Sequence, residues 1–133
     1  MILLMFIFEI VLQVKSSLYN VIIMKNFLEM LEKFKTLPDG TYDINKNPIK
    51  HDYGFQVSFH QIGKRYSEKE YNSLVKEMMK ITKSVPEFGI FEGNEPHVSF
   101  WVQSEALAKE ICKKYFQLAY WDWKYFSTRK VNN

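Results

Sequence analysis

Cysteine is nearly absent from this chain of 133 residues, because Cys112 is its only cysteine. No internal disulfide can form, and a zinc site built from several cysteines of one chain is excluded. Glycine and proline are also scarce, with five and four residues, and the sequence contains no Gly-rich phosphate loop, no Ser/His/Asp arrangement and no paired-carboxylate signature. From sequence motifs we therefore predict no catalytic residues, no metal and no cofactor.

Charge of either sign is modest as well, since the formal net charge is only +3. A value this small does not mark a nucleic-acid-binding protein, and its sign argues against an acidic mimic of DNA. By contrast, apolar residues make up 47% of the chain and aromatic residues 17%, which is enough to fill the core of a single domain. Cys112 falls on the apolar side of a predicted helix, so we expect it to be a buried core residue.

The first 23 residues form an apolar extension that begins MILLMFIFEIVLQV. About 20 apolar residues are needed to cross a bilayer as a helix, whereas this run is shorter and contains Glu9. A signal peptide carries early positive charge, but no Lys or Arg precedes Lys15. A membrane anchor is therefore disfavoured, and the protein is expected to be cytoplasmic. Two interpretations stay open: a translated extension, or a start site misassigned upstream of Met24.

Residues 24–52 are predicted to form a helix followed by a loop. Apolar residues recur at helical spacing from Phe27 to Phe34, which indicates an amphipathic helix over Met24–Lys35. Pro38-Asp39-Gly40 then favours a turn. The polar segment beyond this turn is expected to be mostly loop.

Residues 53–133 are predicted to contain the core. Alternating apolar and polar residues mark the strands, and Ser67 with Glu70 forms a capping box at the start of a helix. In chain order the predicted elements are a strand at 53–62, a helix at 67–83, strands at 88–92 and 97–103, a helix at 104–116 and a strand at 118–126. This order predicts an α+β fold, specifically a ferredoxin-like βαββαβ sandwich with an additional N-terminal helix. The polar tail at 127–133 is expected to fray.

In that fold the helices cover one face of an antiparallel sheet, and the other face carries polar side chains of the two central strands. These side chains are Gln56, Ser58, His60, His97, Ser99 and Trp101. Pairing of Ser58 with Ser99 brings the two histidines opposite each other, at roughly 5 Å between Cβ atoms. The same register places Gln56 opposite Trp101. We therefore expect two imidazoles and two hydroxyls to form one cluster.

Three interpretations of this polar face are open. Two histidines near a phosphate can run acid–base chemistry, and HVSF at 97–100 resembles the His-x-Ser/Thr element of two-histidine phosphoesterases. Such enzymes need a second copy of the element, which is absent here. The face can instead bind single-stranded nucleic acid like an RNA-recognition motif, with Trp101 and Tyr120 stacking on bases. In the third interpretation it contacts a protein partner, or the helix at 24–35 covers it and both histidines are structural.

Aromatic residues are densest at 120–126, which reads YWDWKYF. One interpretation is a strand that packs large rings into the core. The other is a partner-binding patch formed by Tyr120, Trp121, Trp123 and Tyr125, because Trp and Tyr carry much of the binding energy at interfaces. The alternation does not fix which of these side chains point inward, since aromatic rings occupy both faces of the strand.

Three segments resemble parts of small uncharacterised prophage and mobile-element proteins of low-GC bacteria. They are LPDGTYDI at 37–44, YGFQVSF at 53–59 and WDW at 121–123. The resemblance spans most of residues 24–124 and carries no catalytic motif. It implies an inhibitor of host defence, such as an anti-CRISPR protein that occludes the surface of a nuclease.

Together these observations predict a non-enzymatic protein-binding module that engages a host protein or ribonucleoprotein, with a CRISPR effector as the most concrete partner. An RRM-like nucleic-acid-binding domain and a small His-dependent phosphoesterase are the alternatives. The predicted partner contacts are Gln56, Ser58, His60, His97, Ser99, Trp101, Tyr120, Trp121, Trp123 and Tyr125.

Overall fold

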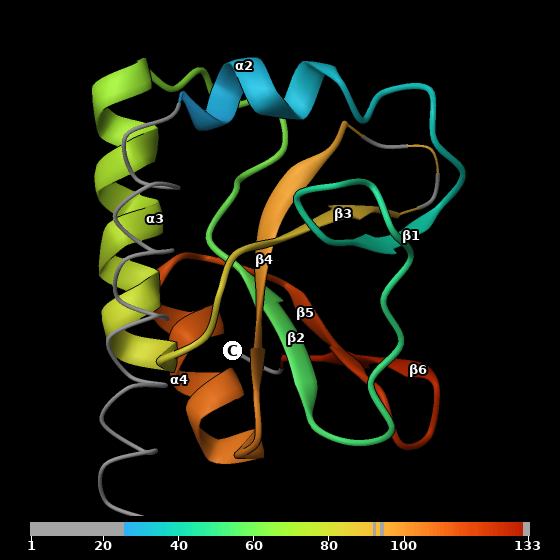
Figure 1. Cartoon of the computed structure of the whole chain (residues 1–133). Coiled ribbons are helices and arrows are strands. Elements are labelled where there is room, and N and C mark those ends of the chain that lie inside the picture. Colours follow the sequence, from blue (N-terminus) through green and yellow to red (C-terminus); the bar gives the residue numbers. More distant parts are fainter. Residues whose placement is uncertain (1–25, 92, 94, 132–133) are drawn as a thin grey trace, which may run out of the picture.

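The computed structural model of the chain describes residues 26–91, 93 and 95–131. The extension predicted at 1–23 and the alternative start at Met24 lie outside these residues. The described part forms three helices and six strands, which gives a mixed α+β fold as predicted (Figure 1). In chain order they are α2 (Phe27–Glu32), β1 (Gly40–Tyr42), β2 (Phe55–Ser58), α3 (Glu68–Thr82), β3 (Glu87–Ile90), β4 (His97–Val102), α4 (Glu105–Lys114), β5 (Ala119–Asp122) and β6 (Ser127–Lys130).

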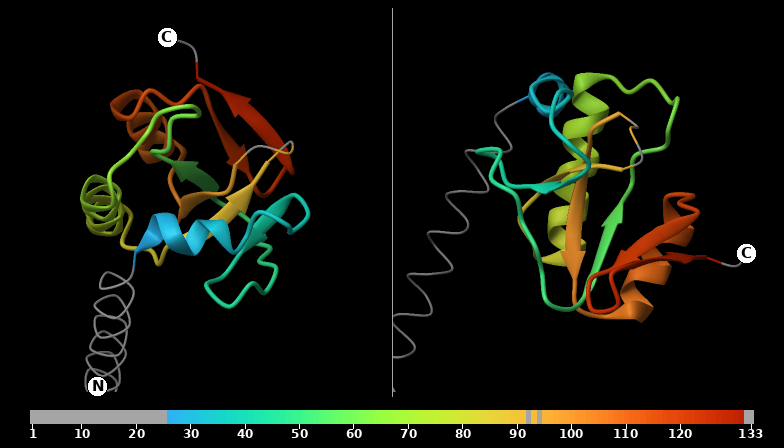
Figure 2. Two further views of the ribbon diagram at one scale, coloured as in Figure 1. Left: turned by 90° about the horizontal axis from the view of Figure 1, so that it is seen from above. Right: turned by 90° about the vertical axis from the view of Figure 1, so that its right-hand side faces the viewer.

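The six strands join one antiparallel sheet in the order β1-β3-β4-β2-β5-β6. The central strands β2 and β4 pair in the predicted register, with Ser58 opposite Ser99 and Gln56 opposite Trp101. The sheet is curled, with the helices gathered along one side of it (Figure 2). One face of the sheet is therefore covered by helices, and the other is concave.

Two predicted strands differ from the structure at their ends. β2 stops at Ser58, so His60 lies just beyond the strand. The strand predicted at 118–126 is divided, because β5 ends at Asp122 and a turn leads into β6. The expectation that the tail frays is wrong as far as Lys130, since the backbone of β6 pairs with β5 along its length.

The helices begin where their capping residues predict. The Ser67 hydroxyl accepts a hydrogen bond from the backbone N–H of Glu70 at 3.1 Å, and the Ser104 hydroxyl accepts one from Leu107 at 3.2 Å. Each bond satisfies a donor that the first helical turn leaves without a partner. The sequence therefore fixes the start of both long helices locally.

The helix-covered face of the sheet holds the core. The buried residues of this face include the predicted Val57, Phe59, Val98, Phe100 and Val102, all at most 2% exposed. Cys112 of α4 is fully buried beside them, as expected for a core residue. Alternation along the strands thus assigns this face correctly.

The short helix α2 packs on the same side of the sheet. Its Phe27 ring and the Phe34 ring beyond its end stack on Phe88 of β3, with centroids 6.5 and 4.6 Å apart. Phe88 pairs with Val98, which belongs to the helix-covered face. The interpretation in which the N-terminal helix covers the polar face is therefore wrong.

Candidate functional site

The concave face of the sheet forms a groove of about 760 Å³. Residues of all six strands line it, together with the ends of the neighbouring loops. Across its mouth the Phe91 ring, just beyond β3, lies 6.3 Å from the ring of Trp121 on β5. β4 and β2 separate these strands in the sheet, so this contact spans the groove from one side to the other.

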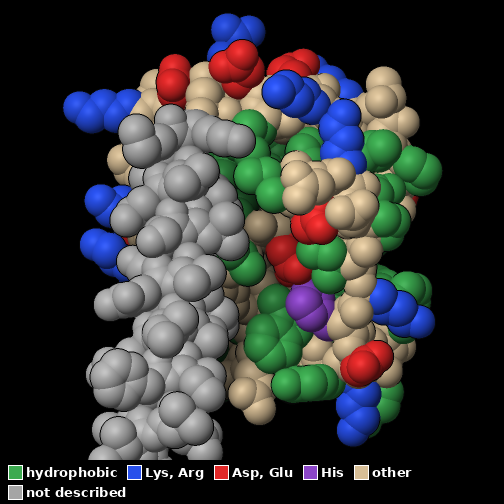
Figure 3. Space-filling model, viewed as in Figure 1, with side chains coloured by type: hydrophobic (Ala, Val, Ile, Leu, Met, Phe, Trp, Pro, Cys, Tyr) green, Lys and Arg blue, Asp and Glu red, His purple; other side chains and the backbone are tan. Residues whose placement is uncertain are grey.

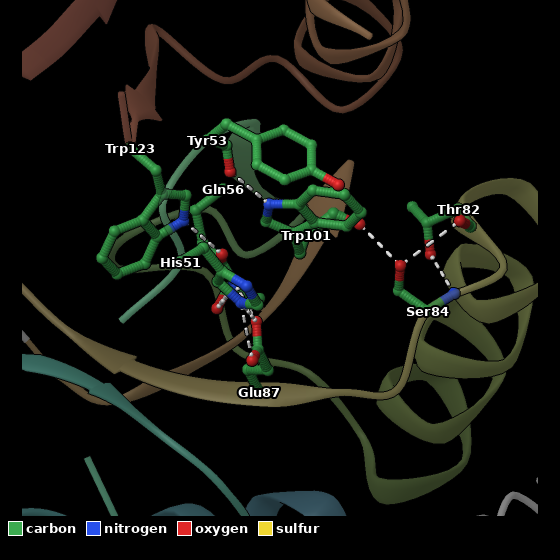
Figure 4. Close-up of polar contacts among 9 residues, drawn as sticks. His51, Tyr53, Gln56, Thr82, Ser84, Glu87, Trp101 and Trp123 are labelled. Carbon is green, nitrogen blue, oxygen red and sulfur yellow. Dashed lines mark hydrogen bonds and ion pairs between the residues drawn. The ribbon is translucent and has the colours of Figure 1, made fainter. Parts of the chain in front are cut away.

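One end of the groove floor is a closed polar network centred on Gln56. Its amide nitrogen donates to Glu87 and to the Ser99 hydroxyl, both at 2.9 Å, and its amide oxygen accepts from the Trp123 indole at 2.9 Å (Figure 4). Gln56, Glu87 and Ser99 are each at most 8% exposed. This part of the polar face is therefore buried, and Gln56 and Ser99 are not available as the partner contacts that the sequence predicted.

A loop segment that we call the strap, residues 43–54, covers this network. Its His51 ring donates from Nε2 to the Glu87 carboxylate, 3.0 and 3.1 Å from the two oxygens. The same ring stacks on Trp101 with centroids 5.4 Å apart and meets Trp123 edge-on at 5.3 Å. On the face seen in Figure 1, acidic and histidine side chains lie recessed among hydrophobic ones (Figure 3). The strap thus holds its position through a carboxylate–imidazole pair set between two indoles.

The rings of Trp101 and Trp123 both make contacts within the chain, where Trp101 is half-buried and Trp123 is buried. The Trp101 indole donates to the backbone oxygen of Tyr53 at 2.8 Å, and its face is occupied by His51. Trp123 is only 7% exposed. An RRM-like face needs an open aromatic ring on a central strand, and the His51 ring already occupies this position on Trp101.

The two predicted histidines do come together, at the other end of the groove floor. The His60 and His97 rings have centroids 6.1 Å apart. The Tyr71 hydroxyl accepts a hydrogen bond from the Val98 amide at 3.2 Å and lies 3.0 Å from Nδ1 of His60. The contact between the Tyr71 hydroxyl and His60 anchors that imidazole to α3.

Burial favours the neutral form of both imidazoles. Burial lowers the pKa of His60, and burial together with the nearby His60 lowers the pKa of His97 to about 4. A general acid–base pair needs one imidazolium near neutral pH, so this geometry gives no support to phosphoesterase chemistry. Among the described residues no group of three or more His, Cys, Asp or Glu side chains could hold a metal ion.

We expect this histidine pair to make stability fall as the solution becomes acidic. Because the folded-state pKa of His97 is depressed below its unfolded value of 6.5, its stabilising contribution is complete above pH 6.5 and is lost progressively toward pH 4. The expected loss at pH 5 relative to pH 7 is roughly 2 kcal/mol. Urea denaturation of the wild type and His97→Gln at both pH values measures it. An equal pH dependence in both proteins would contradict this assignment.

The aromatic residues of β5 divide between the two faces. Tyr120 is buried on the helical side, where its hydroxyl donates to Glu105 at 2.6 Å, and burial raises its pKa to about 12. Trp121 lies on the concave side, where it packs edge-on against Phe126 with centroids 4.8 Å apart. Tyr120 is therefore a core residue, and Trp121 is a groove residue.

The turn between β5 and β6 carries the most exposed aromatic rings of this region, Tyr125 at 65% and Phe126 at 62%. The Lys124 ammonium and the Arg129 guanidinium each lie 5.5 Å from the Tyr125 centroid, and Lys50 of the strap lies 5.8 Å from that of Phe126. We call these five residues the aromatic–cationic patch. Sequence reasoning identified only Tyr125 among them as a contact residue.

None of the described helices combines the length and the apolar character needed to cross a membrane. No protein-family model matches the chain, and neither a curated protein nor a solved structure shows significant similarity to it.

Proposed function

We propose that the protein is a non-enzymatic binding module that contacts an acidic surface of a partner protein through the aromatic–cationic patch. The observation that supports this most directly is the pair of exposed rings, Tyr125 and Phe126, each with a cation against it. Exposed aromatic side chains are the typical anchors of protein interfaces. Cations stacked on them retain their charge at the surface and add attraction for carboxylates.

The charge of the patch supports an acidic partner. The acid bonded to Arg129 of the patch, Asp122, is buried and already neutralised, since Nε and Nη2 of Arg129 contact its carboxylate at 3.2 and 3.1 Å. Its other oxygen accepts from the backbone N–H groups of Lys124 and Tyr125, at 3.1 and 3.2 Å. These bonds fix the turn before any partner arrives, so less conformational entropy is lost on binding.

The resemblance of three segments to prophage and mobile-element proteins supplies the most concrete form of this proposal. In that form the protein is an anti-CRISPR inhibitor that acts in the cytoplasm of a host bacterium. It occludes a nuclease or ribonucleoprotein by contact rather than by chemistry. An acidic site on the effector, where nucleic acid is cut or bound with the help of metal ions, is a natural target for a cationic patch.

We also propose that the segment from β2 to β5 is a ferredoxin-like core. The order β3-β4-β2-β5 within the sheet supports this, together with the two helices α3 and α4 that follow β2 and β4. In this view β1 and β6 are additions at the two edges, and α2 is an additional helix. The addition of β6 places Lys124, Tyr125 and Phe126 of the patch in the turn of a hairpin.

We expect the double substitution Tyr125→Ala/Phe126→Ala to abolish partner binding while the fold persists. Both rings are more than half exposed, so their loss should shift the midpoint of thermal unfolding by only a few degrees. Tagged wild-type and variant proteins are compared by affinity purification from host lysate, with quantitative mass spectrometry. A specific partner of the wild type should be retained at least tenfold less by the double variant.

Two controls make this test decisive. Val85→Ala removes an exposed apolar side chain away from the patch and should retain the partner fully. Lys124→Glu should weaken retention, whereas Lys109→Glu on the exposed side of α4 should not. Equal retention by all variants would exclude the patch as the binding surface. A partner lost on nuclease treatment would replace the protein proposal with binding to single-stranded nucleic acid.

A further inference from the structure

The two edges of the sheet differ in whether they can accept another strand. At one edge β1 is closed by the strap, because the backbone N–H of Ile49 donates to the Thr41 oxygen at 2.8 Å and Tyr42 forms a β-bridge with Pro48. At the other edge β6 pairs with β5 alone (Figure 1). Among the described residues, the open edge of the sheet is therefore that of β6.

The backbone groups that form this open edge follow from the register of β6. The Val131 N–H donates to the Leu118 oxygen at 2.8 Å, in the same register that pairs β5 with β6. Hydrogen-bonded and non-bonded pairs alternate along an antiparallel ladder, so every second residue of β6 turns its N–H and C=O groups away from β5. These residues are Thr128 and Lys130.

The side chains along the open edge are exposed and cationic. Thr128 lines the groove, so Lys130 lies on the same concave side, and no carboxylate of the described residues is within ion-pair distance of it. Arg129 lies on the opposite side of the strand, where Nε and Nη2 contact Asp122. The positive charge of Lys130 is therefore uncompensated directly beside the free backbone groups.

This charge discriminates between the strands that could pair with the edge. Antiparallel pairing with β6 of a second copy would bring Arg129 and Lys130 of both copies together, and like charges on opposed strands are destabilising. Lysine on an edge strand is a common protection against such association. A strand that carries carboxylates is favoured at the same position, because opposite charges on neighbouring strands attract.

We propose that β6 binds an extended acidic segment of the partner protein as an additional strand. Its main chain bonds to the free groups of Thr128 and Lys130, and a carboxylate lies against the Lys130 ammonium. In strand addition the main-chain bonds supply affinity and the side chains supply specificity. The inference rests on the proposed function and names the part of the partner that is bound, since the turn that holds Tyr125 and Phe126 leads directly into β6.

Thr128→Pro closes this edge without removing a bond between β5 and β6. The Thr128 N–H points away from β5, and proline is tolerated in an edge strand where this group faces solvent. The matched control is Thr128→Val, which keeps the N–H and a β-branched side chain. Lys130→Glu reverses the charge and leaves the backbone edge intact, so it tests the proposal even if Thr128→Pro fails to fold.

The experiment is a titration of the full chain, at low salt, with a short peptide in which two adjacent glutamates are flanked by threonine and valine. We expect saturable binding that protects the Thr128 and Lys130 amides from hydrogen exchange, measured by NMR. Affinity should be at least tenfold weaker in Thr128→Pro and Lys130→Glu and unchanged in Thr128→Val. Absence of saturable binding, unprotected amides, or equal binding of a peptide with lysines in place of the glutamates would overturn the proposal.

Capture from host lysate separates this inference from the proposed function. A partner that is lost in Tyr125→Ala/Phe126→Ala but fully retained by Thr128→Pro would support the patch and exclude strand addition. A partner that is lost in Thr128→Pro but retained by Tyr125→Ala/Phe126→Ala would support strand addition and exclude the patch. Self-association of the wild type that Thr128→Pro abolishes would assign the edge to a second copy and overturn the proposal.

Discussion

Replacing Gly54 with alanine is expected to lower the free energy of unfolding by about 3 kcal/mol or more. Gly54 has φ +84°, a left-handed conformation that disfavours side chains, and a Cβ here would lie 2.4 Å from Nε1 of Trp101. Displacing the Trp101 indole costs free energy, because it donates a hydrogen bond to the Tyr53 backbone and stacks on the His51 ring. The Gly54 oxygen also accepts from the Trp123 backbone at 3.0 Å, so the backbone is held as well.

The matched control is Gly63→Ala. Gly63 has nearly the same φ of +83°, but a Cβ there would have no atom within 4 Å. Urea denaturation of both variants separates the two costs: Gly63→Ala measures backbone strain alone, about 1 kcal/mol, and the excess in Gly54→Ala measures the clash with Trp101. Equal losses in the two variants would show that Trp101 and the strap yield easily, contrary to the tight packing described here.

Phe88→Ala is expected to cost about 3–5 kcal/mol, the usual range for removing a fully buried phenyl ring. The ring is 1% exposed and carries the stacking of both Phe27 and Phe34. Its loss should therefore release α2 from the sheet as well as leave a cavity. Denaturation measures the first effect, and faster amide hydrogen exchange in α2 measures the second.

The matched control for Phe88→Ala is Phe91→Ala, which removes a phenyl ring just beyond the end of β3. Phe91 is 43% exposed and stands on the concave side, so its removal should cost about 1 kcal/mol or less. Exchange in α2 should remain slow in this variant. A similar loss of stability from both substitutions would mean that the concave side is as tightly packed as the core.

Local signals in the sequence account for most of the fold. Ser67 and Ser104 mark helix starts, and alternation from Phe55 and from His97 identifies the two central strands and their buried faces. The prediction that the tail at 127–133 frays is wrong at β6, and the reason is equally local. STRK at 127–130 has neither an apolar face nor a β-branched run, so its strand conformation comes from pairing with β5 rather than from its own residues.

The candidate site was predictable only in part. The sequence places Ser58, His60, His97 and Ser99 together on one face, and the histidine rings do meet there. What it could not supply is the strap. His51 and Glu87 are 36 residues apart, and no local pattern marks a loop histidine and a strand carboxylate as partners. For the same reason Trp101 and Trp123 looked like exposed anchors, whereas a long-range contact covers them.

Because the single cysteine is buried, its reaction with a thiol reagent reports local opening of the fold. Cys112 is fully enclosed between α4 and β5, where its thiol donates to the Ala119 oxygen at 3.7 Å, and burial raises the pKa of the thiol to about 11. A thiol reagent attacks the thiolate of an accessible cysteine, so the native state should resist labelling. The labelling rate of the wild-type chain, measured without any substitution, then reports the separation of α4 from the sheet. At high reagent concentration the rate becomes that of the opening step itself.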